Sequence, residues 1–239
     1  MAVSDPESMR RGAYATGRPA SIDSAGVAER LERWGLWAGI AFVVLFVVRF
    51  VAFLDTPESD APASEWKDHL ADSGNRTQIL VGTYLMAFAG LAFLWFMASL
   101  FGRLRDIEDR PGFLTRLGYG AGAIFVTMLF GSAAAMGTVA AGVEFGDMPV
   151  PDGEFPRQFE NLGFGLLLLF GMFAAGVFMA AVSFIGLRTA LLPRWLAIAG
   201  LVAAPLVLLF GVVFVPMLLL VLWVLAVSIA LLRVHPTPA

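Results

Sequence analysis

The chain has 239 residues, of which 59% are hydrophobic and 15% are charged, and its mean hydropathy is +0.79. Soluble proteins have roughly 45 to 50% apolar and about 25% charged residues, so this composition indicates an integral membrane protein. The absence of cysteine excludes disulfides, thiolate metal sites and cysteine nucleophiles, and the small net charge of −3, carried almost entirely between hydrophobic blocks, argues against a nucleic-acid partner.

The N-terminal segment, residues 1–28, mixes Ser, Gly, Pro, Ala and Arg without periodicity. Such a segment cannot bury enough apolar surface to fold, so we expect a disordered cytoplasmic tail. Residues 29–233 are predicted to form the transmembrane domain, and residues 234–239 a second short cytoplasmic tail.

Six apolar blocks follow the N-terminal tail, at residues 34–54, 78–101, 117–142, 162–187, 194–210 and 213–232. About 20 apolar residues in a helix cross a hydrocarbon layer of roughly 30 Å. The blocks are continuous and lack the alternation of barrel strands, which favours helices. The sequence therefore predicts an all-α, polytopic membrane bundle of six transmembrane helices. Pro205 and Pro216 leave open a kinked or partly re-entrant last pair, although a tight hairpin is preferred.

Basic residues are distributed unequally between the two sides of this bundle. One side carries twelve arginines: Arg10, Arg11, Arg18, Arg30, Arg33, Arg103, Arg105, Arg110, Arg116, Arg188, Arg194 and Arg233. The other side has only Lys67, Arg76 and Arg157, together with eleven acidic residues. The positive-inside rule then predicts that both termini are cytoplasmic, in a multi-pass protein of the bacterial inner membrane.

The first outer loop contains SEWKDHLADSG, which spaces Trp66 and Leu70 by four residues. We expect a short helix on the membrane surface, with Ser64 as its N-cap and Gly74 as its stop. This helix would either cover the loop or act as a lid or partner-binding element.

Small residues recur every four positions in the third and fourth spans, as in Gly118 and Gly122 or Gly171 and Ala175. Such faces allow close approach of helix backbones. These spans are therefore predicted to be the central helices, with a homodimer interface as the competing use.

Ionisable groups are scarce inside the predicted spans. The two histidines, His69 and His235, lie outside the spans, and apart from Arg194 at the first position of its span, Arg49 is the one charged residue within them. Enzymes and ion-coupled pumps of the membrane generally keep such groups for relay or catalysis. We therefore expect a protein that is not an enzyme and has no cofactor or metal.

Arg49 interrupts the apolar run FVVLFVVRFVAFL near the outer end of the first span. Its side chain leans toward the helix N-terminus, away from the nearer water, which weakens snorkelling as an explanation. The hypothesis is a polar pocket in which Arg49 hydrogen-bonds Tyr84 or Thr138 and pairs with Glu144. Snorkelling, or contact with a lipid headgroup or an anionic ligand, remains an alternative.

Two stretches carry a resemblance, GLAFLWFMASLFGRLR at 90–105 and LRTALLPRWLAIAGLVAAPLVLL at 187–209. The chain resembles uncharacterised six-helix bacterial membrane proteins grouped among domains of unknown function. This resemblance implies an inner-membrane location and no particular reaction. The expected function is a non-enzymatic accessory or sensor subunit, with a membrane-protein partner or a homodimer. The alternative is a facilitator that passes a small apolar or amphipathic molecule through an outward-facing cavity, and an intramembrane enzyme is the least favoured interpretation.

Overall fold

The computed structural model describes residues 24–58, 60–107, 112–211 and 214–233, and these residues are helical with no strand. The elements are α1 (Ser24–Ala52), the 3-10 turn η1 (Phe53–Asp55), α2 (Ala63–Ala71), α3 (Ser73–Ile107), α4 (Phe113–Phe145), α5 (Glu154–Phe164), the π-helical segment η2 (Gly165–Gly171), α6 (Met172–Thr189), α7 (Arg194–Phe210) and α8 (Phe214–Arg233). The predicted all-α bundle is confirmed. The predicted tails lie outside the described residues, except that residues 24–28 already belong to α1.

Five stretches of the described chain are long and apolar enough to cross a membrane: Arg33–Ala52, Ser73–Leu104, Phe113–Phe145, Glu154–Thr189 and Val215–Arg233. The protein is therefore a multi-pass membrane helix bundle. The sixth apolar helix, α7, has only 17 residues, which correspond to about 25 Å, somewhat less than a hydrocarbon layer of roughly 30 Å.

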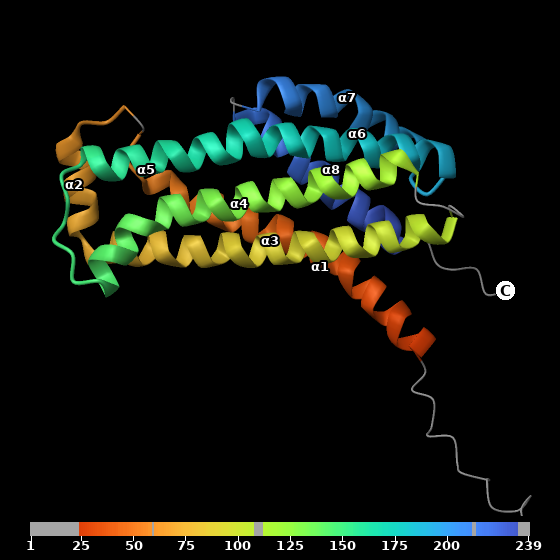
Figure 1. Cartoon of the computed structure of the whole chain (residues 1–239), viewed down its shortest axis with the longest axis horizontal. Helices are drawn as coiled ribbons and strands as arrows, with labels where there is room; N and C mark the ends of the chain where they lie inside the picture. The colour runs from red at the N-terminus through yellow and green to blue at the C-terminus, as the bar shows by residue number, and fades with distance from the viewer. Residues whose placement is uncertain (1–23, 59, 108–111, 212–213, 234–239) are drawn as a thin grey trace, which may run out of the picture.

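The long helices close into a ring, in which α1 packs on α3 and α8, α3 on α4, α4 on α6, α6 on α7, and α7 on α8. Helices α5, η2 and α6 form one continuous rod alongside α4 (Figure 1). The two spans rich in small residues, α4 and α6, thus pack directly on each other.

An aromatic layer fills the middle of the bundle. The ring of Phe93 lies 5.0 Å from the rings of both Phe42 and Phe125, and 5.3 Å from that of Phe178. All four side chains are fully buried. Edge-on and tilted contacts of this kind stabilise aromatic pairs beyond their buried area, so α1, α3, α4 and α6 meet at one rigid layer.

Gly211, the C-cap of α7, lies beside the start of α6 and not at the end of the bundle at which α5 begins. A Cβ added at Gly211 would lie 2.3 Å from Cβ of Met172, the first residue of α6. The hairpin therefore matches only the 18 residues of α6, or about 27 Å. Helices α3, α4 and α5 extend beyond it toward α2 (Figure 1).

Helix α2 forms where the sequence predicts a short helix, but its ends differ from the prediction. Pro62, and not Ser64, occupies the N-cap, and the helix ends at Ala71 before Gly74 is reached. The reason is Asp72, whose Oδ1 accepts hydrogen bonds from the backbone N–H groups of Gly74 at 2.7 Å and Asn75 at 3.1 Å. This carboxylate caps the start of α3 and so makes the corner between the two helices.

Candidate functional site

Arg49 lies near the end of α1 with only 7% of its surface exposed. Its side chain runs against the backbone of α3 at Gly82, where an added Cβ would lie 2.7 Å from both Cδ and Nε of the arginine. Only a glycine leaves room for this approach. The arginine therefore points into the bundle and does not snorkel to the surface.

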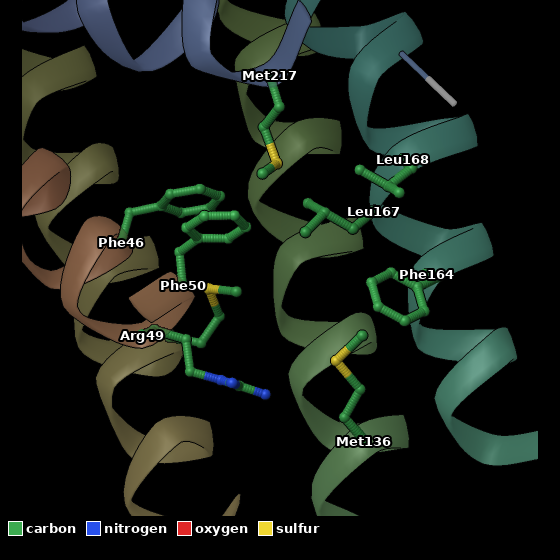
Figure 2. Close-up of a pocket in the computed structure, with 9 residues that line it drawn as sticks. Phe46, Arg49, Phe50, Met136, Phe164, Leu167, Leu168 and Met217 are labelled. Carbon is green, nitrogen blue, oxygen red and sulfur yellow. The ribbon is translucent and has the colours of Figure 1, made fainter. Parts of the chain in front are cut away.

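A narrow cavity opens beside the guanidinium. Besides Arg49, its walls are apolar and come from α1, α3, α4, α5, η2 and α8: Phe46, Phe50, Met86, Met136, Phe164, Leu167, Leu168 and Met217. Figure 2 shows the guanidinium directed from α1 toward Met136. The cavity volume is about 40 Å³, which is room for roughly two or three water molecules and far below the roughly 300 to 1,000 Å³ of a typical ligand pocket.

The cavity wall includes part of the π-helical segment. Leu167 and Leu168 belong to η2, and Phe164 immediately precedes it. A π-helical segment within a helix is rare and is found frequently at functional sites. Its coincidence with the buried arginine distinguishes this part of the bundle from the regular helices around it.

Glu160 is the electrostatic partner of Arg49. It lies on α5, is 7% exposed, and attracts the arginine across the interior of the bundle. Among the described residues its Oε1 has no hydrogen-bond partner. A buried carboxylate and a buried guanidinium stabilise each other's charge, whereas either one alone would be strongly unfavourable.

The predicted polar pocket of Arg49, Tyr84, Thr138 and Glu144 is not the arrangement in the structure. Tyr84 is 64% exposed, and Thr138 lies on an exposed face with its hydroxyl donating to Ala134 O at 2.5 Å. Glu144 instead accepts from Nε of Arg76 at 2.8 Å. The predicted burial of Arg49 inside the bundle is confirmed, whereas its predicted pairing with Glu144 is wrong.

The error has a physical cause in the fourth apolar block. The apolar block predicts a span that begins at residue 162, just after Glu160, whereas the helix begins at Glu154 and Glu160 is its seventh residue. Glu160 is thus carried into the interior. The amphipathic sequence EFPRQFENLGF was the available signal, because Pro156, Glu160 and Gly163 share the buried face of α5.

Helix α2 packs across the end of the bundle at which α5 begins (Figure 1). Trp66 and Leu70 are buried, and Leu70 packs in a cluster with Val139 and Ala140 of α4. Arg76 donates from Nη1 to Leu70 O and Ala71 O, both at 2.9 Å, while its Nε pairs with Glu144. Helix α2 is therefore fastened to α3 and α4 as a cover over the interior.

The start of α5 is held against α2 as well. Nζ of Lys67 lies 3.3 Å from Oδ1 of Asp152, and a Cβ at Gly153 would lie 1.6 Å from Ala63 O. The first residues of α5 therefore lie directly against α2.

Comparison of the chain with family models, with curated proteins and with solved structures found no match. The interpretation of this site consequently rests on its geometry and on the chemistry of its residues.

Proposed function

We propose that the protein is a non-enzymatic accessory or sensor subunit of a bacterial inner membrane, in which Arg49 and Glu160 form the switch. The observation that carries this proposal is the burial of two opposite charges, Arg49 and Glu160, where Arg49 lines a narrow cavity next to the π-helical segment. Ionisable residues inside a membrane bundle are expensive and are retained for function. The attraction between a charge on α1 and a charge on α5 is a local interaction, and a change in it can bias two arrangements of the helices.

The facilitator interpretation receives less support from the geometry. With about 40 Å³, the cavity admits water and little else, and α2 packs across the end of the bundle at which α5 begins. A transported amphipathic molecule would require a much wider passage between α1 and α5.

Spin labels test the switch, because a chain without cysteine accepts two labels without background. Cysteines replace Val51 on α1 and Leu162 on α5, which are both exposed. We expect Glu160→Gln to change the distribution of distances between the labels, whereas Glu144→Gln leaves it unchanged. Liposomes that contain either protein should release small solutes no faster than empty ones. An unchanged distance distribution together with solute release would contradict the sensor proposal and support the facilitator interpretation.

Six spans with cytoplasmic termini complete the proposal, and the arginine distribution supports them. Membrane-impermeant maleimide applied to intact cells should label Asp68→Cys on α2 and leave Arg194→Cys at the start of α7 unlabelled, although both positions are exposed in the fold. The reverse labelling would invert the orientation.

A further inference from the structure

Two open grooves lie on the surface of the bundle at the end where α4 begins and α6 ends. The first, of about 380 Å³, runs between α4, α6 and α7 and is lined by residues that include Leu117, Val177 and Phe184. The second, of about 550 Å³, runs between α4 and α6 with its η2 extension and shares Leu117 and Val177 with the first. The two grooves are therefore neighbours that meet at these two side chains.

Hydrocarbon is the natural occupant of both grooves. They are cut into segments long and apolar enough to span a membrane, and their walls are almost entirely apolar. Small residues such as Gly120 and Ala180 create the space, and nothing lies within 4 Å of a Cβ added at Gly120. Acyl chains fill such surfaces, since an apolar groove offers water no hydrogen bonds.

An arginine stands at the end of each groove. Arg116, which is exposed, lines the second groove directly. Arg188, also exposed, lies with its Cζ 4.5 Å from the ring centroid of Phe184, a wall of the first groove. This cation–π contact holds the second guanidinium above its groove. Two guanidinium groups over two neighbouring hydrocarbon grooves complement a phosphate with two acyl chains.

We infer that this double groove binds one anionic glycerophospholipid, with its phosphate held by Arg116 and Arg188 and one acyl chain in each groove. The inference is independent of the proposed switch, because the grooves do not include Arg49 or Glu160. It also holds whichever leaflet this end of the bundle faces.

Native mass spectrometry of the purified protein tests the inference with phosphatidylglycerol and phosphatidylcholine of identical acyl chains. We expect phosphatidylglycerol to be retained preferentially, with each arginine contributing roughly five-fold to the preference. Arg116→Gln and Arg188→Gln should each reduce the preference by that factor. The matched control Arg194→Gln, exposed at the same end but outside both grooves, should leave it unchanged.

Gly120→Leu tests the acyl-chain part, because a Cβ at this position enters open space and a leucine side chain is expected to fill the second groove. We expect it to lower the occupancy of both lipids, with an unchanged melting temperature in lipid-free detergent. Equal retention of the two lipids by the parent protein would overturn the inference. A loss of preference in Arg194→Gln as large as that in Arg116→Gln and Arg188→Gln would overturn it too. A dimer that dissociates in Gly120→Leu would assign the grooves to a second copy of the chain and would overturn it as well.

Discussion

The bundle is packed differently in the aromatic layer around Phe93 and in the charged layer, which contains Arg49, Glu160 and the cavity beside Arg49. Around Phe93, fully buried rings from four helices are in edge-on and tilted contact. Around Arg49, the walls include three methionines from three different helices, Met86, Met136 and Met217, and a cavity remains. Methionine is unbranched and adapts to irregular gaps, so the charged layer can change its packing where the aromatic layer cannot.

The difference suggests that the aromatic layer provides stability, whereas the charged layer allows movement. The aromatic layer holds α1, α3, α4 and α6 together, while α5, which carries Glu160, is joined to α6 through η2, whose hydrogen bonding departs from a regular helix. A displacement of α5 would therefore change the distance between Arg49 and Glu160 without disturbing the rings. Four substitutions or conditions test this contrast.

The largest effect is expected from Arg49→Met, which removes one charge of the buried pair. The carboxylate of Glu160 would be left in the interior without its cation, and breaking a buried pair in this way costs about 3 to 5 kcal/mol. Chemical unfolding in detergent should show this loss. The double variant Arg49→Met/Glu160→Gln should recover most of it, since no buried charge remains. Equal losses in the single and double variants would mean that the two side chains do not interact.

A smaller effect is expected from Gly200→Ala, which tests the packed part of the bundle. The added Cβ would lie 2.1 Å from Oγ of Ser183 and 2.4 Å from Nε1 of Trp223, both of them buried. Overpacking of a full core costs about 1 to 3 kcal/mol. The matched control is Gly120→Ala, whose Cβ meets open space and should leave the unfolding midpoint nearly unchanged.

The sequence was sufficient for the fold class and for the buried position of Arg49. Hydrophobic blocks of span length predict the helices, and Arg49 within one of these blocks indicates the site. The carboxylate partner was missed because the start of α5 is amphipathic, so a search for continuous apolar residues ended before Glu160. The cavity was missed because its walls come from helices far apart in the sequence, for which no local pattern exists.

The pairing of Glu144 with Arg76 provides the next, weaker test. The Glu144 side chain is one-third exposed, and exposed ion pairs contribute only about 0 to 1 kcal/mol. Glu144→Gln should therefore lower stability by much less than Arg49→Met. In double-mutant cycles, the effect of Glu144→Gln on the free energy of unfolding should be non-additive with that of Arg76→Gln and additive with that of Arg49→Met. Coupling to Arg49 would restore the partner predicted from the sequence.

The smallest effect concerns the cover, where His69 of α2 responds to pH. Nδ2 of Asn75 donates to both the His69 carbonyl oxygen and Nδ1 of its ring, each at 3.1 Å, which requires Nδ1 to be unprotonated. Burial lowers the pKa of His69 below its ordinary 6.5, against the opposing attraction of Asp72, Asp55 and Glu65. The unfolded segment therefore binds more protons than the docked one.

The docked α2 is consequently most stable above pH 6.5, and it loses stability as the pH falls through that value, until the folded histidine is protonated as well. Amide hydrogen exchange in α2, corrected for the intrinsic pH dependence and compared at about pH 8 and about pH 5, should show weaker protection at the lower pH. The aromatic layer should be unaffected, because none of its rings titrates. In His69→Gln, which keeps a side-chain acceptor for Asn75 without a titratable ring, the change should disappear. The same loss of protection in that variant would assign it to the surrounding carboxylates instead.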